Sequence, residues 1–323
     1  MTAPLRFLSP IAQRLRAGNE RILVTGATGW LGRALLEMLG EAFGPALGAR
    51  VRCFGSVPKM VRLRDGSSVA QHALADLETL PAQPSILFHF AYLTKEKTAA
   101  MTAAEYVERN RSISALTERA AAKVGADRVF LASSGAAAQA LAAGAGVDSV
   151  HAYGALKLED EALFRRYAES GAHRRVLAVR LFNLSGPYIN KLGSYALSSF
   201  IEQARSNGVI EIKAAHRVVR SYTAVENLLA TAMAHLLDEG AGRWSCIDTA
   251  GEREVEVGEL AQRVRALVGP QVDIRRPDVA TDRVDRYVGD GSAYRSMAAR
   301  LGVAQHPLDR QIEDTRDYLV QVT

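Results

Sequence analysis

The stretch Thr25-Gly26-Ala27-Thr28-Gly29-Trp30-Leu31-Gly32 follows the apolar run 22–24 and precedes a helical pattern of apolar residues at 35, 38 and 39. A strand that leads through a glycine turn into a helix is typical of a dinucleotide site. Gly26 permits the tight turn, Gly29 lets the backbone approach a pyrophosphate, and Gly32 lets the helix pack on the strand. The helix N-terminus offers N–H groups to the anion. Glycines at this spacing also fit an ordinary strand-to-helix turn, but the flanking strand and helix favour a phosphate-binding turn.

The composition is that of a globular protein. The chain has 323 residues, of which 48% are hydrophobic, and a net charge of +5. No apolar run approaches the roughly 20 residues that span a bilayer, and the N-terminus lacks a secretory h-region, so we expect no membrane partner and a cytoplasmic location. The two cysteines, Cys53 and Cys246, lie in apolar stretches and are expected to be buried, without a disulfide or a metal site. The basic residues are scattered, which argues against nucleic acid.

Residues 1–20 form an N-terminal extension. Ser9 and Pro10 predict the N-cap and first position of a short amphipathic surface helix, and an import peptide is the alternative. After the glycine turn, we expect a helix that ends in a glycine-rich linker at 44–48. The second strand is expected at 51–54.

The end of that second strand normally reads the adenosine ribose, with an acid for a free 2′-hydroxyl or basic residues for a 2′-phosphate. Gly55 occupies the acidic position and Ser56 follows it. Three cations come close behind, at Lys59, Arg62 and Arg64. The missing acid and these cations favour NADP over NAD, although a solvated basic loop would contain the same residues.

Three further segments are expected to reach the same site. Asp76-Leu77, after a strand-like stretch, is placed to contact the adenine. The apolar strand 86–91 predicts a buried parallel strand that ends at the cofactor, and its His89 is expected to be structural rather than a metal ligand. After a helix at 103–124, a strand at 128–132 delivers Ser133 and Ser134 to the same sheet edge.

A candidate catalytic group follows. Tyr153 and Lys157 lie at i and i+4 in a helical pattern and therefore share a helix face. An ammonium near a phenol lowers the pKa of the phenol, which can then exchange a proton with a hydroxyl or carbonyl near neutral pH. The Ser134 hydroxyl can hold the same oxygen in place. Together with the phosphate turn, this combination predicts proton transfer coupled to dinucleotide chemistry.

With these motifs in place, the chain from about residue 21 onward resembles the extended short-chain dehydrogenase/reductases. The matching segments are TGATGWLG, Asp76-Leu77, HFAYL at 89–93, Asn110, FLASS, YGALK and RLFNLSGP at 180–187. The resemblance implies a catalytic triad of Ser134, Tyr153 and Lys157, with Asn110 supporting the tyrosine helix and a relay water, and Lys157 also binding the nicotinamide ribose. The expected cofactor contacts are Gly26, Thr28, Gly29, Trp30, Leu31, Ser56, Asp76, Leu77, Phe90, Ala91, Thr94, Asn110, Ser133, Tyr153, Lys157 and Phe182.

The second half of the chain resembles the nucleotide-sugar enzymes of that family. In RLFNLSGP, Asn183 would touch the substrate diphosphate or sugar, and in VRSYTAVEN at 219–227, Arg220 would bind the diphosphate. Ser134 would also contact the substrate. A surface salt bridge is the alternative role for Arg220. Arg283 or Arg286 could add a further cationic contact.

One departure bears on the reaction. Dehydratases of this family have an Asp-Glu pair directly after the catalytic Ser/Thr, whereas Gly135-Ala136 stand here. Dehydration is therefore disfavoured. The apolar loop 135–147 leaves the sugar side of the pocket undefined.

We therefore predict an α/β fold with a Rossmann-type doubly wound parallel sheet at 21–183 and a smaller, discontinuous substrate-binding part mainly at 184–323. The expected activity is NAD(P)-dependent 4-keto reduction or 4-epimerisation of a nucleotide-sugar by a homodimer. The alternatives are a reductase of a non-sugar carbonyl compound and a non-catalytic dinucleotide-binding protein.

Overall fold

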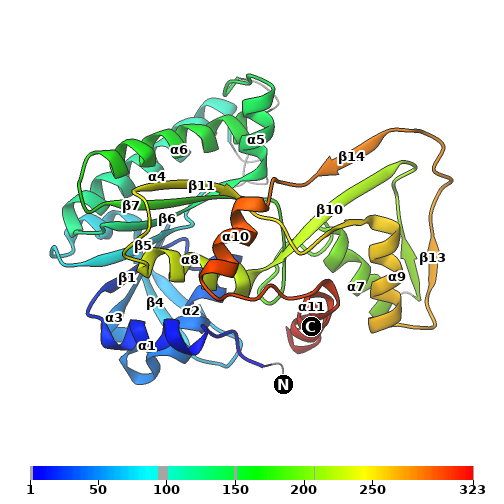
Figure 1. The fold of residues 1–323 in the computed structure, drawn as a ribbon, viewed down its shortest axis with the longest axis horizontal. Coiled ribbons are helices and arrows are strands. Elements are labelled where there is room, and N and C mark those ends of the chain that lie inside the picture. Colours follow the sequence, from blue (N-terminus) through cyan, green and yellow to red (C-terminus); the bar gives the residue numbers. More distant parts are fainter. Residues whose placement is uncertain (1–2, 94–100, 149–150, 207, 323) are drawn as a thin grey trace.

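The computed structural model of the chain describes residues 3–93, 101–148, 151–206 and 208–322. Within these residues, the fold is built on an eight-stranded sheet with the order β11-β7-β6-β5-β1-β2-β4-β3 (Figure 1). All neighbouring strands are parallel except β3, which runs antiparallel to β4. The strands are β1 (Arg21–Thr25), β2 (Val51–Gly55), β3 (Lys59–Arg62), β4 (Ser68–Ala73), β5 (Ser85–His89), β6 (Arg128–Ser134), β7 (Arg175–Leu181) and β11 (Trp244–Asp248). This order confirms the predicted Rossmann-type sheet.

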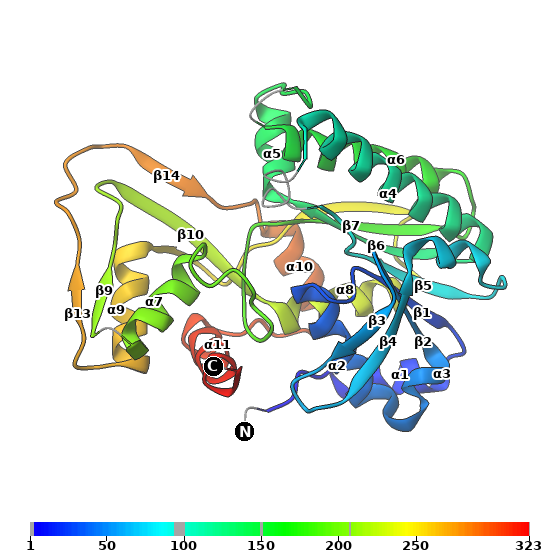
Figure 2. The same ribbon diagram turned by 180° about the vertical axis from the view of Figure 1, so that it is seen from behind.

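Helices cover both faces of this sheet (Figures 1 and 2). Side chains alternate between the faces of a strand, so in β1 Leu23 joins one core while Ile22 and Val24 join the other. One core is covered by α4 (Ala103–Val124) and α6 (Ala152–Glu169), near η2 (Leu74–Thr79). The other is covered by α1 (Ser9–Ala17), α2 (Trp30–Phe43) and α8 (Val225–Leu237). The strands β1 and β5 are buried along their whole length, as their apolar sequences predict.

Two local predictions near the N-terminus were wrong. The helix α1 begins one residue early, with Leu8 rather than Ser9 as the N-cap, because Leu8 has the extended backbone of a cap and proline occupies the first helical turn. The glycine-rich segment 44–48, predicted only as a linker, is helical. It forms η1 (Gly44–Ala46) and the start of α3 (Leu47–Arg50), because Pro45 fits the first turn of a helix.

The second half of the chain builds a smaller part beside the large sheet (Figure 1). A short sheet joins β12 (Glu254–Glu256), β10 (Arg217–Ala224) and β14 (Val284–Tyr287), and β8 (Asn183–Ser185) pairs with β10. A second pair joins β9 (Val209–Glu211) and β13 (Asp273–Arg275). The helices are α7 (Ala196–Ser206), α9 (Val257–Val268), α10 (Ser292–Arg300) and α11 (Leu308–Val322). Because β11 from this half completes the large sheet, the two halves interleave, and the boundary at 183 stays a prediction.

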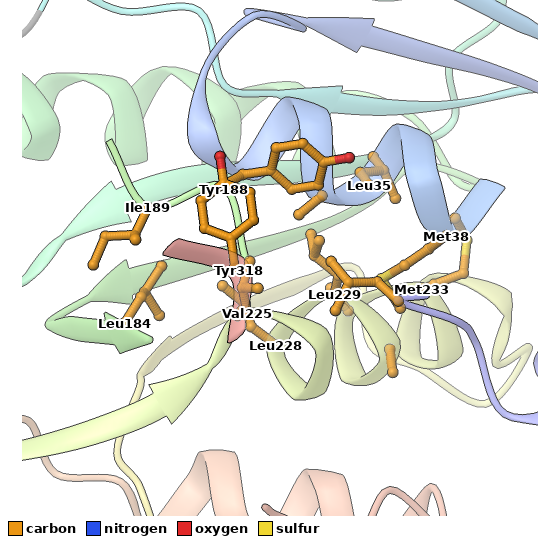
Figure 3. Close-up of a cluster of buried hydrophobic side chains, with 14 of the residues drawn as sticks. Leu35, Met38, Leu184, Tyr188, Ile189, Val225, Leu228, Leu229, Met233 and Tyr318 are labelled. Atoms are coloured by element: carbon orange, nitrogen blue, oxygen red, sulfur yellow. The ribbon is translucent and has the colours of Figure 1, made fainter. Parts of the chain in front are cut away.

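A buried junction ties the two parts together (Figure 3). Leu35 and Met38 of α2 lie near Leu229 and Met233 of α8 and the ring of Tyr188. Beside this apolar cluster, Glu37 of α2 accepts hydrogen bonds from the Leu5 amide, the Tyr188 hydroxyl and the Arg64 guanidinium at 2.6 to 3.0 Å. The junction therefore fixes the segment that follows β8.

Both cysteines are unpaired. Cys53 is buried as expected, whereas Cys246 in the edge strand β11 is only partly buried, because this strand has a neighbour on one side only. Among the residues described, no group of three or more His, Cys, Asp or Glu side chains could hold a metal ion. No helix in the described part of the chain is long and apolar enough to cross a membrane.

Candidate active site

The glycine turn between β1 and α2 has the close backbone contacts that its sequence predicts. Gly26 has φ +71°, and a Cβ there would lie 2.7 Å from the Ala91 nitrogen. A Cβ at Gly32 would lie 2.6 Å from the Gly26 oxygen, so a side chain at either position would force the turn apart. The N-cap of α2 is Gly29, which has no side chain to cap this helix end. The uncapped N–H groups suit the pyrophosphate of a dinucleotide.

A cleft of about 500 Å³ opens from this turn along the carboxyl ends of the parallel strands. In open α/β sheets this edge is where ligands bind. The cleft brings together thirteen of the predicted site residues: Gly26, Thr28, Gly29, Trp30, Leu31, Phe90, Ala91, Ser133, Ser134, Tyr153, Lys157, Phe182 and Asn183.

Five predicted residues do not line this cleft. Ser56 lies beyond the end of β2, and Asp76 is exposed and accepts a hydrogen bond from the Ala73 amide. The Leu77 side chain is fully buried against the core that contains Phe54. The other two, Asn110 and Arg220, are described below, and Thr94 lies outside the described residues.

The three candidate catalytic residues lie on one wall of the cleft. Ser134 ends β6 and caps α5 (Gly135–Ala142) by accepting a hydrogen bond from the Ala136 amide at 3.2 Å. Tyr153 and Lys157 stand one turn apart on α6. The Tyr287 side chain, from the distant strand β14, lies beside Ser134: a Cβ at the next residue, Gly135, would be 2.6 Å from the Tyr287 hydroxyl. A tyrosine of the second half thus meets the serine of the first.

The Lys157 ammonium is almost fully enclosed. Its Nζ donates to the Ala132 carbonyl at 3.0 Å and to the Asp160 carboxylate at 3.3 Å, and it lies 3.4 Å from the centroid of the Tyr92 ring. Burial lowers the pKa of Lys157, and the nearby Asp160 carboxylate opposes that shift. The Tyr92 ring also meets the Tyr153 ring edge-on, with centroids 5.7 Å apart.

The Ser133 hydroxyl points into a buried ion pair rather than into the site. It donates to Glu161 at 2.5 Å, and the same carboxylate accepts two hydrogen bonds from Arg180 at 2.7 and 2.9 Å. The pairing raises the pKa of Arg180, because the Glu161 carboxylate stabilises the charged guanidinium. Ser133 therefore has backbone, rather than a free hydroxyl, to offer a cofactor.

Asn110 supports a different element from the one expected. Its Oδ1 accepts from the Leu93 amide at 2.8 Å, and its Nδ2 donates to the Tyr106 carbonyl. Asn110 therefore holds the segment after β5 against α4 by accepting this Leu93 N–H. His89 is structural, as predicted: its Nδ1 shares a 2.8 Å hydrogen bond with Thr25, and burial lowers its pKa to about 3.

The predicted substrate residues differ in their placement. Asn183 lines the cleft, and its Nδ2 donates to the Tyr287 carbonyl at 3.2 Å. Arg220 instead forms an ion pair with Asp285 at 2.9 Å and donates to the Asp285 carbonyl, because β14 runs directly beside β10. The structure thus shows the salt bridge that was the alternative role for Arg220. Arg286 pairs with Glu254.

The cations expected near the ribose are also separated. The Arg64 guanidinium pairs with Glu37 at 2.6 Å, and both side chains are 5% exposed, so Arg64 is held in the junction rather than at the end of β2. Lys59 and Arg62 lie on the edge strand β3. These three cations therefore do not form the solvated basic loop that was the alternative: two lie on a strand and the third is in a buried ion pair.

Several residues of the cleft were not predicted as site residues. Tyr92, Asn190, Lys191, Tyr195 and Tyr287 all line it. The indole of Trp30 donates to the Pro187 carbonyl at 2.7 Å, and its ring lies edge-on to Tyr195, with centroids 6.0 Å apart. These contacts join the phosphate turn to the segment after β8. Only the apolar or aromatic character of that segment could have indicated them.

The charge of the cleft has one sign. Among the described residues that line it, the basic side chains are Lys157 and Lys191, and no Asp or Glu is present. A positive cleft with low-dielectric walls attracts anionic ligands.

The family model described as NAD dependent epimerase/dehydratase matches residues 22–245. A search of curated proteins gave no match. Among solved structures, the chain is similar to a UDP-N-acetylglucosamine 4-epimerase from Methanobrevibacter ruminantium, with 19% identity and a TM-score of 0.71 over 94% of this chain and 99% of that one. It is also similar to a UDP-glucuronic acid 4-epimerase from Bacillus cereus solved with NAD, with 17% identity and a TM-score of 0.69 over 94% and 100% of the two chains.

A further similar structure is an NAD-dependent NDP-hexosamine 5,6-dehydratase of tunicamycin biosynthesis, with 14% identity and a TM-score of 0.67 over 93% and 98% of the two chains. At these identities the likeness shows a shared fold, while the family model covers more than half of the chain. The chain is an enzyme of the extended short-chain dehydrogenase type and belongs to the NAD dependent epimerase/dehydratase family.

Proposed function

We propose that this chain modifies a nucleotide-linked sugar by hydride transfer at a sugar carbon, either by 4-epimerisation or by 4-keto reduction. The observation that carries the proposal is the cleft itself. It places Ser134, Tyr153 and Lys157 along one wall, between the glycine turn and the segment 183–195 of the second half. A bound sugar would then meet the proton-transfer group and the cofactor site together.

The residues of the chain have separate tasks in this mechanism. The nicotinamide supplies the hydride chemistry when it is bound. Tyr153 exchanges a proton with the sugar oxygen, and Ser134 holds that oxygen by a hydrogen bond. Tyr287 lies beside Ser134 and shapes this end of the cleft. Lys157 supplies the positive charge that favours the phenolate of Tyr153.

The space after Ser134 supports hydride transfer without dehydration. A Cβ at Gly135 would lie 2.6 Å from the Tyr287 hydroxyl and 2.7 Å from the Phe182 ring. An acidic side chain at this position would therefore displace Tyr287 or Phe182. No Asp or Glu is present among the described lining residues of the cleft to act as the acid or base of a dehydration.

The diphosphate of the substrate requires cationic or amide partners in the cleft. Asn183 and Lys191 line the cleft, whereas Arg220 does not line it and is paired with Asp285. We therefore propose Asn183 and Lys191 as the first diphosphate contacts, with Arg220 joining only after release from its ion pair.

Calorimetric titration with UDP tests this assignment. Loss of a charge-assisted contact costs on the order of 2 kcal/mol, so Lys191→Met should weaken UDP about 30-fold. Arg220→Ala should weaken it less. The reverse order would restore Arg220 as the principal contact. If the unaltered chain binds no nucleoside diphosphate, the nucleotide-sugar proposal fails and a reductase of a non-sugar carbonyl compound becomes the better account.

Cofactor turnover separates the two reactions. UDP-sugars are incubated with the protein and either trace NAD(P) or stoichiometric NADPH, and the products are identified by mass spectrometry and NMR. An epimerase converts the sugar with trace oxidised cofactor, whereas a reductase consumes one reduced cofactor per product. If neither condition alters any nucleotide-sugar while UDP still binds, the chain is a non-catalytic binding protein.

We further propose NADP or NAD as the cofactor, with NADP favoured by Gly55 and Ser56 at the end of β2 and by Lys59 and Arg62 on β3. Because Arg64 is paired with Glu37, this preference rests on fewer cations than the sequence suggested. We also propose a homodimer, which light scattering coupled to gel filtration tests.

A further inference from the structure

A buried carboxylate stands directly behind Lys157. Asp160 lies three residues further along α6, on the same helix face, and is 4% exposed. Its Oδ2 accepts from the Lys157 Nζ at 3.3 Å, and its Oδ1 accepts from the Ser114 hydroxyl of α4 at 2.6 Å. Asp160 does not line the cleft, so a ligand bound there would meet Lys157 and not Asp160.

The surroundings of Lys157 account for its three N–H groups. One donates to the Ala132 carbonyl, one to Asp160, and the third is left for the face of the Tyr92 ring. Since Lys157 is 4% exposed, little water is available to replace any of these partners. Removal of Asp160 would therefore leave a buried ammonium with one carbonyl and one ring.

The other charged groups around the pair are few. Glu161, the next residue of α6, also favours the charged Lys157, but its carboxylate is already shared between Ser133 and Arg180. From β5, the buried His89 is neutral, because burial and the neighbouring Lys157 lower its pKa to about 3. The tyrosines 92 and 153 contribute rings, and the half-buried Glu159 adds to the rise in the pKa of Asp160. Asp160 is thus the only described carboxylate that bonds to Lys157.

We propose that Asp160 is a positioning residue, which keeps the Lys157 ammonium charged and fixed beside Tyr153. The face of the Tyr92 ring packs against the same ammonium. Burial lowers the pKa of Lys157 and raises the pKa of Asp160, and the mutual attraction of the pair opposes both shifts. The hydrogen bond from Ser114 stabilises the charged form of Asp160 and so also lowers its pKa. The proposal rests on the role of Tyr153 as the proton-exchanging group in the proposed function.

The test is the titration of Tyr153 in the absence of ligands. Tyrosinate absorbance at 295 nm is followed against pH in the parent protein and in Asp160→Asn, each with and without Tyr153→Phe, so that the difference isolates Tyr153. Without the carboxylate, Lys157 loses its proton at a lower pH and Tyr153 retains its own longer. The midpoint of Tyr153 should therefore move upward by about one pH unit, a tenfold change.

Two further variants complete the design. Glu159→Gln removes a carboxylate from the neighbouring position of the same helix, where it pairs with Arg111 at the surface, and should leave the midpoint unchanged. Ser114→Ala keeps the Asp160 charge but removes its hydrogen bond, and should give a smaller upward shift even if Asp160→Asn folds poorly.

An unchanged or lowered midpoint in Asp160→Asn overturns the proposal, and if that variant does not fold, an unchanged midpoint in Ser114→Ala overturns it instead. Because no substrate or cofactor is present, such a result would leave the nucleotide-sugar assignment untouched. Conversely, failure to bind UDP would not alter the titration. A second readout is the affinity for NADP, measured by quenching of Trp30 fluorescence from the cleft wall. It should fall at least threefold in Asp160→Asn and stay constant in Glu159→Gln.

Discussion

Replacing Glu37 by Gln should destabilise the whole chain, because this carboxylate holds the buried junction together. Glu37 accepts from the Arg64 guanidinium, the Leu5 amide and the Tyr188 hydroxyl, and the Glu37 and Arg64 side chains are each 5% exposed. The variant removes the carboxylate charge that faces the buried Arg64 guanidinium. Breaking a buried pair from one side costs roughly 3–5 kcal/mol.

Urea denaturation monitored by circular dichroism measures this loss in the free energy of unfolding. Thermal denaturation is a second measurement: at about 2 °C per kcal/mol for a chain of this size, the midpoint should fall by roughly 6–10 °C. Glu41→Gln is the matched control, because Glu41 is exposed on the same helix and its replacement should stay within about 0.5 kcal/mol of the parent. Adding Arg64→Met to Glu37→Gln removes both charges and should recover much of the stability. A Glu37→Gln protein within 1 kcal/mol of the parent, or a double variant no better than the single one, would refute the reasoning.

Three further outcomes are expected. Tyr153→Phe removes the exchangeable proton and keeps the ring, so turnover should drop by about 100-fold or more with cofactor affinity largely intact, and near-normal turnover would contradict the assignment. Calorimetric titration should show NADP binding more tightly than NAD. Gly55→Asp should reverse that order only when Gln71 is also shortened, because a Cβ at Gly55 would lie 2.4 Å from the Gln71 amide; equal affinities in the parent would remove the basis for NADP preference. Because the pKa of His89 is lowered to about 3 in the fold, the unfolded chain binds more protons below pH 6.5, and stability should fall by about 2 kcal/mol between pH 7 and 5. In His89→Leu, this part of the acid sensitivity should disappear.

The sequence predicted the elements that follow from local pattern. The glycine turn, the helix 103–124 and the delivery of Ser134 and Tyr153 to one edge all depend on nearby residues and on the order of strands in a parallel sheet. The single sequence could not predict which charges pair. Arg220 meets Asp285 only because β14 lies beside β10, across more than sixty residues of chain.

The same reason explains the aromatic residues that were missed. Tyr287 comes from β14 to lie beside Ser134 in the cleft. Tyr92 lies within the quoted HFAYL segment, but nothing in that segment shows that its ring lies beneath Lys157 and against Tyr153. A tyrosine between apolar residues is most often core, and only the packing of α6 against the end of β5 distinguishes this one.

The hydrogen bond from Trp30 to the Pro187 carbonyl has a thermodynamic consequence for the two ligand sites. The indole belongs to the phosphate turn, while Pro187 and Tyr195 belong to the segment that would close over a sugar. A ligand that orders either element also orders the other, so the second ligand meets a wall whose conformational entropy has already been lost. Cofactor and substrate should therefore bind cooperatively. Because such coupling is reciprocal, each should raise the affinity of the other by the same factor.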